Sequence, residues 1–99
     1  MDTVFKLQGV EFEWDEEKYS ANLTKHGIKF ETAAEVFFDP FNQFGNASVA
    51  TENREFVVGF SHDFLLLFTV FIERSERIRI ISARLATPSE QKNYARRKQ

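Results

Sequence analysis

The sequence predicts an α+β fold, in which two N-terminal helices pack on an antiparallel β-sheet (a meander) and a C-terminal helix follows. Apolar side chains between Phe30 and Phe37 recur three and four residues apart, which is the spacing of a helix that buries one face. After residue 54, three apolar segments are joined by short polar connections at 61–63 and 73–77, as expected for antiparallel neighbours. The 99 residues predict a single domain over 1–99.

The first predicted elements are a strand and a helix. Residues 10–14 alternate apolar side chains with glutamates, as in a strand that is buried on one face. Asp15 is a suitable N-cap residue for the helix that follows, because its carboxylate can accept hydrogen bonds from free backbone N–H groups. Gly27 is the type of residue that commonly ends a helix in a left-handed conformation. The first helix is therefore expected between these two residues.

The remaining elements follow from turn residues and apolar runs. A second helix should begin near Phe30 and end before Asp39-Pro40, because a residue that precedes proline disfavours the helical conformation. Residues 41–54 are rich in Asn, Gly, Ser and Thr and predict a long loop, with one short strand as an option. Residues 64–72 are apolar except for Thr69, which is typical of a central strand covered on both faces. Thr87-Pro88-Ser89-Glu90 matches a capping box and predicts the start of the C-terminal helix.

The composition excludes several classes of site. The chain has no cysteine, so it contains neither a disulfide nor a thiolate metal site. With two histidines, a zinc site would need carboxylate ligands, and no metal or other cofactor is expected. The longest apolar run is far shorter than the roughly 20 residues of a membrane-spanning helix. The N-terminal residues lack the pattern of a signal peptide, so a cytoplasmic protein with no membrane partner is expected.

Charge is divided unevenly along the chain. Residues 1–50 hold four Lys or Arg and nine Asp or Glu, whereas residues 51–99 hold nine and six. An acidic and a basic surface on one small domain would explain this division. Ordinary solvated charge is the simpler explanation, and the composition alone favours it.

One face of the first predicted helix carries polar side chains. Lys18, Asn22, Lys25 and His26 recur at helical spacing and share this face. An exposed polar face is the ordinary explanation, since charged residues are mostly solvated. The alternative is chemistry, because histidine titrates near neutral pH and is the side chain most often used for general acid–base catalysis.

Arginines gather in the last predicted hairpin. Arg74, Arg77, Arg79 and Arg84 lie on one strand and its turn, where guanidinium groups can hold phosphates in a bidentate manner. Charged strands also discourage edge-to-edge aggregation, and this explanation has equal weight. Strand alternation places Arg77 and Arg79 on one face and Arg84 on the other, unless a β-bulge intervenes. Glu73, at the end of the preceding strand, is either a proton acceptor or an arginine partner.

Two long motifs resemble the signatures of the BrnT toxins. The first is FEWDEEKYSANLTKHGIKFETAAEVFFDP at 12–40, and the second is ERSERIRIISARLATPSEQKNY at 73–94. The match extends from about residue 12 to 94. The resemblance implies a RelE-like fold and a metal-independent endoribonuclease toxin of a type II toxin–antitoxin system, which cleaves RNA and inhibits translation. It also implies a BrnA-like antitoxin that neutralises the toxin and alone contacts DNA.

Metal-independent RNA cleavage defines the roles that the candidate residues would fill. Attack of the 2′-hydroxyl on the adjacent phosphorus needs a base, an acid and cations for the developing charge. We expect His26 as general acid or base with Lys25 beside it, and arginines that hold the phosphate. The candidate catalytic residues are thus Lys25, His26, Arg79 and Arg84, and the candidate RNA-binding residues are Lys18, Arg54, Glu73 and Arg77. The alternative is a non-catalytic protein-interaction module or an inactive toxin homologue.

Overall fold

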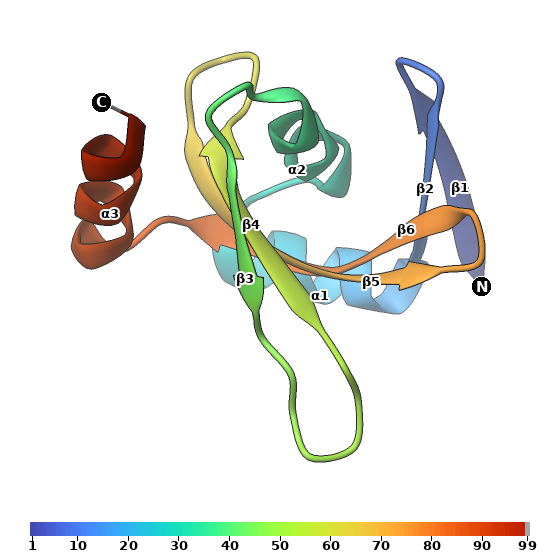
Figure 1. Ribbon diagram of the computed structural model, residues 1–99. Coiled ribbons are helices and arrows are strands. Elements are labelled where there is room, and N and C mark those ends of the chain that lie inside the picture. The colour runs from blue at the N-terminus through green and yellow to red at the C-terminus, as the bar shows by residue number, and fades with distance from the viewer. Residues whose placement is uncertain (99) are drawn as a thin grey trace.

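The computed structural model describes the backbone of residues 1–98 and the side chains of residues 1–97. These residues form three α-helices, one 3₁₀ turn and a six-stranded sheet (Figure 1). None of the described helices is long and apolar enough to cross a membrane. In chain order the elements are β1 (Asp2–Leu7), β2 (Val10–Asp15), α1 (Glu16–His26), α2 (Phe30–Glu35), η1 (Val36–Phe38), β3 (Gln43–Asn46), β4 (Glu55–Phe60), β5 (Leu66–Arg74), β6 (Arg77–Leu85) and α3 (Pro88–Lys98).

The predicted helix boundaries of α1 are confirmed by its caps. The carboxylate of Asp15 accepts a hydrogen bond from the backbone N–H of Lys18 at 3.2 Å. Gly27 has a φ of 71°, and its N–H donates to the carbonyl of Leu23. The capping box that begins α3 is also present, since Thr87 and Glu90 exchange hydrogen bonds between side chain and backbone.

The sheet is mixed, so the prediction of a purely antiparallel sheet is wrong. Its strand order is β1-β2-β6-β5-β4-β3, and all neighbours are antiparallel except β2 and β6. That parallel contact joins Phe12 to Ile78 and Glu13 to Arg79. Short connections determine the direction of consecutive strands, but β2 and β6 are separated by most of the chain. Their local sequences therefore contain no signal for the direction of the pairing.

Strand β1 was absent from the sequence prediction. It pairs antiparallel with β2 along its whole length, and the two residues of the turn, Gln8 and Gly9, have φ values of 50° and 82°. Positive φ at both turn residues matches the right-handed twist of a two-residue hairpin. The alternation of Thr3, Phe5 and Leu7 with more exposed residues is the signal that could have identified this strand.

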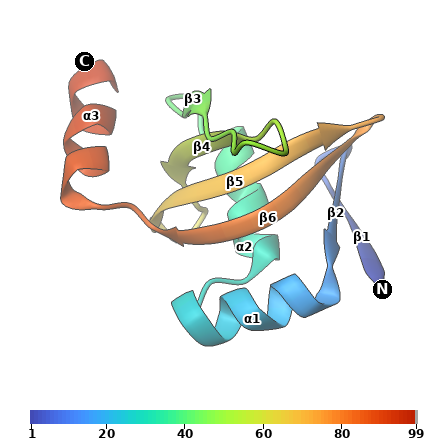
Figure 2. The ribbon, with the colours of Figure 1, turned by 90° about the horizontal axis from the view of Figure 1, so that it is seen from below.

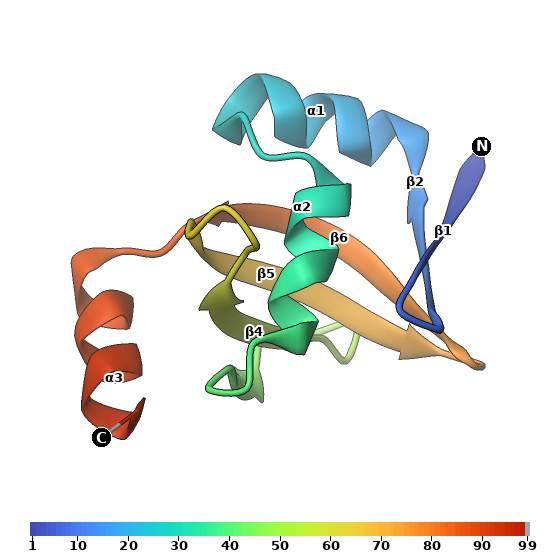
Figure 3. The same ribbon diagram turned by 90° about the horizontal axis from the view of Figure 1, so that it is seen from above.

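The helices are arranged differently from the prediction. Helix α2 crosses one face of the sheet, whereas α1 lies along the edge of β6 (Figures 2 and 3). The core lies between α2 and the sheet and includes the fully buried side chains of Phe12, Phe30, Phe71, Leu67 and Ile80. Helix α3 contacts the end of β4, where the rings of Phe60 and Tyr94 lie 5.3 Å apart.

The sheet face that points away from α2 is called here the open face. Along β5, Leu67, Thr69 and Phe71 are buried, while the alternating side chains of Phe68 and Ile72 are half-buried on the open face. The central strand is therefore covered fully on one face, and the prediction of cover on both faces is wrong. Arg79 and Arg84 of β6 pair with Ile72 and Phe68 and therefore point to this open face.

Candidate functional site

A β-bulge decides where the arginines of β6 point. Val70 of β5 pairs with Ser82, but the next residue, Phe71, pairs with Ile80, so Ile81 is an extra residue in β6. Ile80 and Ala83 are both fully buried although they are three residues apart. The bulge thereby brings the arginines on both sides of it to the open face, which resolves the alternatives that strand alternation had left open.

Arg84 is held at one end of the open face. Its guanidinium carbon lies 4.2 Å from the centre of the Phe68 ring, and its two terminal nitrogens donate to the Glu90 carboxylate at 2.8 and 3.0 Å. These bonds raise the pKa of Arg84 and lower the pKa of Glu90. The Arg84 side chain is thus directed toward α3.

Arg79 is held at the other end, in the direction of β1 and β2. Its guanidinium donates to both oxygens of Asp2 at 3.0 and 3.1 Å and to Glu13 at 2.7 Å. The hydrogen bond with Asp2 is the main cause that raises the pKa of Arg79 and lowers that of Asp2. Arg79 pairs with Ile72 of β5. Arg84 pairs with Phe68, which is four residues before Ile72 on β5. The two arginines therefore lie about 13 Å apart along the sheet.

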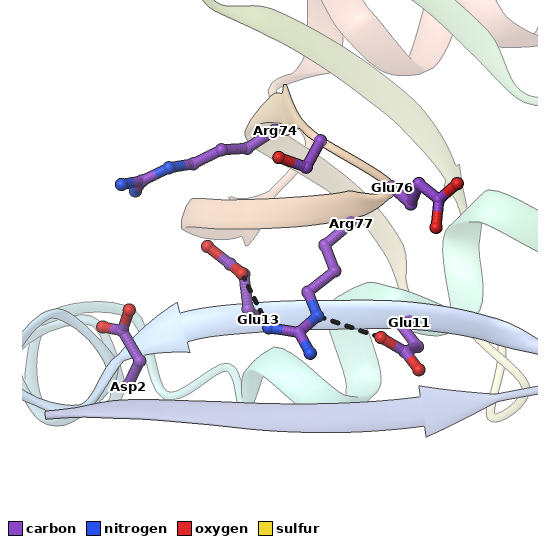
Figure 4. Close-up of a pocket in the computed structure, with 7 residues that line it drawn as sticks. Asp2, Glu11, Glu13, Arg74, Glu76 and Arg77 are labelled. Carbon is purple, nitrogen blue, oxygen red and sulfur yellow. Dashed lines mark hydrogen bonds and ion pairs between the residues drawn. The ribbon is translucent and has the colours of Figure 1, made fainter.

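Arg77 lies in a pocket beside the hairpin turn, which Arg74 also lines (Figure 4). Its side chain bonds Glu11 at 2.9 Å and lies 3.6 Å from a Glu13 oxygen. The pocket also contains the carboxylates of Asp2 and Glu76. The structure therefore places Arg77 among acidic side chains.

The open face contains a cationic hollow of about 460 Å³ next to the bulge. We use this name for the hollow lined by Lys18, Glu52, Arg54, Ile72, Arg74, Arg79 and Ile81. One carboxylate is present, and it pairs with Arg54 at 2.6 Å. Lys18 and Arg74 form no ion pair within the described residues, so their charges are available to an anion. Arg74 was recognised in the predicted hairpin but was not among the predicted site residues.

Asn22 fixes α1 beside this hollow. Its amide nitrogen donates to the carbonyls of Ile28 and Ala83, and its amide oxygen accepts from the N–H of Ala83. Asn22 is 6% exposed, so the solvated explanation is wrong for this member of the polar helix face. Because Asn22 is bonded to β6, the helix holds Lys18 next to the strand that carries Arg79.

Lys25 and His26 lie near the end of α1, and neither lines the cationic hollow. On an α-helix, Lys25 is roughly 20° from Lys18 around the axis, and His26 is roughly 20° from Tyr19. Lys18 faces the hollow, whereas the ring of Tyr19 packs on buried Phe30. Helix geometry thus directs Lys25 toward the open face and His26 toward the helical layer.

Glu73 lies away from the cationic hollow. It pairs with Ile78, and the side chain of Ile78 packs against the core on the α2 side of the sheet. Strand alternation therefore directs Glu73 to that side, whereas its neighbour Arg74 lines the hollow.

The grouped cations can bind phosphate groups, since guanidinium and ammonium donors make charge-assisted hydrogen bonds to phosphate oxygens. In the described part of the chain, no three His, Cys, Asp or Glu side chains are grouped so that they could hold a metal ion. The cations of the hollow can therefore bind an anionic backbone, and the ionisable side chains of α1 lie nearby.

Comparison with known proteins agrees with this picture. Residues 14–90 match the family model of the ribonuclease toxin BrnT of type II toxin–antitoxin systems. The crystal structure of the Brucella abortus ribonuclease toxin BrnT is similar in fold, with a TM-score of 0.51 and 24% sequence identity over 75% of this chain and 92% of that one. A search of curated proteins finds no match. The family match spans more than half of the chain, which therefore belongs to the BrnT family of ribonuclease toxins.

Proposed function

We propose that this protein cleaves RNA without a metal ion in the cytoplasm, and that this cleavage inhibits translation. The cationic hollow is the observation that carries the proposal. Its four cations come from α1, the segment before β4, β5 and β6, and all lie inside the segment that matches the toxin family. An RNA strand that crosses the open face would place its phosphates against these side chains.

In the proposed reaction, the 2′-oxygen of one nucleotide attacks the adjacent phosphorus. A base removes the 2′-hydroxyl proton, the bond from phosphorus to the 5′-oxygen breaks, and an acid protonates that oxygen. The products are a 2′,3′-cyclic phosphate and a free 5′-hydroxyl. Arg79 and Lys18 would stabilise the charge on the non-bridging oxygens. Because Arg79 and Arg84 are held in opposite directions, they would contact different phosphates of one strand.

Lys25 and His26 are the candidates for proton transfer. Helix geometry directs Lys25 to the same side as Lys18, so we expect Lys25 to contribute more than His26. Substitution of the group that transfers the proton should lower the rate about 10²- to 10⁴-fold. The two neighbouring variants Lys25→Ala and His26→Ala form a matched pair. Equal rates for wild type and both variants would exclude the end of α1 from the reaction.

Type II toxins act together with a protein antitoxin, and we propose a BrnA-like antitoxin as the partner. Such a partner would contact DNA, and this protein would reach DNA only through it. Co-expression of the adjacent gene product should restore growth of cells that express this protein. Retention of that gene product on the tagged toxin during purification would test the direct contact.

The central experiment combines growth and cleavage. Induction of the protein alone should stop growth, and the purified protein should cut RNA in the presence of EDTA. An Arg79→Ala variant should be much less active in both assays. A protein that leaves growth and RNA unchanged would be a non-catalytic interaction module, and a loss of cleavage in EDTA would contradict the metal-independent mechanism.

A further inference from the structure

The turn between β4 and β5 presents a phenylalanine to solvent. Phe64 is 82% exposed, although it is a large aromatic residue. Its backbone has a φ of 64°, in the left-handed region that bulky side chains rarely adopt. The residue lies between the two motifs that resemble the toxin family, so neither motif accounts for it. Exposure of an apolar ring and strain of the backbone thus coincide at one position.

The hydrogen bonds of the turn explain this conformation. The N–H of Phe64 donates to the Ser61 carbonyl at 3.0 Å, and the N–H of Ser61 donates to the Leu65 carbonyl at 2.9 Å. A three-residue hairpin loop has this pattern, and its last residue takes the left-handed conformation that favours glycine. The Glu35 carboxylate of α2 accepts from the N–H of His62 and holds the turn against the helix. A rigid turn therefore carries phenylalanine where glycine would be less strained.

The exposed ring borders a hollow of about 410 Å³ between this turn (yellow in Figure 1) and α3. We call it the turn hollow. The rings of Phe60 and Tyr94 pack edge to face within it, 5.3 Å apart, whereas the Phe64 ring is left to solvent. None of the residues that line the turn hollow is charged, and they are Phe60, Phe64, Leu66, Gln91, Tyr94 and Ala95.

The lining of the turn hollow fits a protein better than RNA. A nucleic-acid backbone is bound by cations, and no cation lines this hollow. Leu66 lines the turn hollow and Ile72 lines the cationic hollow, and these residues are six apart on β5. The two hollows are therefore separated by about 20 Å along the strand. An apolar side chain of a protein partner is the group that matches the uncharged lining.

Charges beside the turn hollow favour a different protein over a second copy of this chain. Asp63 is exposed and directly precedes Phe64, and the Glu35 carboxylate is bonded to the same turn. In a two-fold contact through Phe64, residues near the axis would meet their own counterparts, so two Asp63 carboxylates would repel each other. A partner with a Lys or Arg next to its apolar side chain would instead complement these carboxylates. The toxin–antitoxin family provides a protein partner in the antitoxin.

We propose that the turn hollow is a docking site for the antitoxin. An apolar side chain of the antitoxin enters between Phe64 and α3, and a basic residue beside it pairs with Asp63. Rigidly held aromatic residues are common anchors of protein interfaces, which gives the strained Phe64 a role. This inference rests on the proposed function, because it assumes an antitoxin partner, and it names the surface on which that partner binds.

The test measures the affinity of the full-length protein for the adjacent gene product by calorimetry. Phe64→Gly removes the ring and relieves the left-handed strain, so this variant should unfold at the same temperature as wild type or a higher one. Its affinity should be about 30-fold or more weaker, the size typical of an aromatic anchor. Its RNA cleavage should be unchanged, and co-expression of the adjacent gene product should no longer restore growth.

Three further variants test the other parts of the surface. Asp63→Asn keeps an acceptor for the Ser61 hydroxyl but removes the charge, and should weaken binding about 2- to 5-fold. Ala95→Glu places a carboxylate in the turn hollow at an exposed helix position and should weaken binding as strongly as Phe64→Gly. Ser89→Glu adds the same charge to another side of α3 and should bind as wild type does.

Several outcomes would overturn the proposal. Wild-type affinity of Phe64→Gly would do so and would leave the antitoxin partner itself intact. If wild type does not bind the adjacent gene product, the partner and its docking site both fail, and RNA cleavage by the same preparation would show that the ribonuclease function stands. Equal losses for Ala95→Glu and Ser89→Glu would show a general effect of charge. Self-association of wild type that Phe64→Gly abolishes, with unchanged affinity for the gene product, would assign the turn hollow to a second copy.

Discussion

The side chain of Asn22 pairs with both backbone groups of Ala83, 61 residues later in the chain. The amide nitrogen donates to the Ala83 carbonyl at 2.9 Å, and the amide oxygen accepts from its N–H at 3.0 Å. Strand β2 pairs with β6 only at Ile78 and Arg79, so at Ala83 this edge has no neighbouring strand. Asn22 makes the two hydrogen bonds that a strand would otherwise make, and it attaches α1 to the sheet.

We therefore expect Asn22→Ala to lower the free energy of unfolding by about 3 kcal/mol, because it leaves buried backbone groups without partners. Chemical denaturation measures this change. Asn22→Asp should also destabilise the protein, since a carboxylate cannot donate to the carbonyls of Ile28 and Ala83. Thr24→Ala, at an exposed position of the same helix, should change stability by less than about 0.5 kcal/mol. A similar small effect for Asn22→Ala would show that this attachment is unimportant.

Thr69 is a buried polar residue whose hydroxyl has no hydrogen-bond partner within the described part of the chain. It is fully buried on the core face of β5. Valine has nearly the same shape and no hydroxyl, so Thr69→Val should stabilise the protein by about 1 kcal/mol. The midpoint of thermal unfolding should rise accordingly. Thr51→Val, in the exposed loop before β4, provides a control with the same chemical change. Destabilisation by Thr69→Val would show that the Thr69 hydroxyl does have a hydrogen-bond partner.

The sequence predicted the elements that local signals define. The cap residues of α1, the limits of β4 and the capping box of α3 are each determined by neighbours in the chain. The β2–β6 pairing and the role of Asn22 depend on residues more than 60 positions apart, where local patterns contain no information. Alternation alone also cannot locate the bulge at Ile81, which decides the face of Arg84.

The candidate site likewise contains residues that the sequence could identify and contacts that only the fold could reveal. Residue type and motif position selected Lys18, Arg54 and Arg79, and the structure gathers these three around one hollow. The pairing of Arg79 with Asp2 was not predictable, because Asp2 belongs to a strand without a recognised motif. Arg74 was not predicted as a site residue, because only the fold shows which cations have no carboxylate as an ion-pair partner.

Asp2 should compete with RNA for Arg79. Its carboxylate occupies two guanidinium nitrogens, so Asp2→Asn should release a phosphate-binding group and increase affinity for a 2′-O-methyl RNA. The salt dependence of binding should become steeper, by about 0.7 in the slope of log K against log salt for one added phosphate contact. Glu17→Gln makes the same change in net charge on exposed α1 and controls for long-range electrostatics. Equal effects of both variants would contradict a specific role of Asp2.

The Arg84–Glu90 pair should make stability depend on pH. Hydrogen bonds from Arg84 hold the pKa of Glu90 below its ordinary value of 4.5 in the folded protein. A carboxylate with a lowered folded pKa stabilises the protein above its unfolded pKa, and this contribution is lost as pH falls from about 4.5 toward the folded value.

Glu90→Gln should therefore cost about 1–2 kcal/mol at neutral pH, because it removes the charge-assisted hydrogen bonds from Arg84, whereas the amide oxygen can still accept the capping bond from Thr87. The difference from wild type should shrink as the pH is lowered through this window. Urea unfolding at a series of pH values measures both effects. Ser89→Ala, an exposed neighbour in the first turn of α3, should show a constant difference. A pH-independent cost for Glu90→Gln would show that its charge is not involved.

Arg74 and Arg77 face each other across the β5–β6 turn. Substituting each one distinguishes an effect on RNA binding from an effect on stability. Arg74 lines the cationic hollow and has no carboxylate partner in the described chain, so Arg74→Ala should weaken RNA binding and reduce the salt slope by about 0.7. Arg77 bonds Glu11 and lies close to Glu13, so Arg77→Ala should mainly lower stability and leave RNA affinity nearly unchanged. Titration of 2′-O-methyl RNA at several salt concentrations, together with denaturation of both variants, measures the contrast. The opposite ranking would move the RNA path from the open face to the acidic pocket beside the turn.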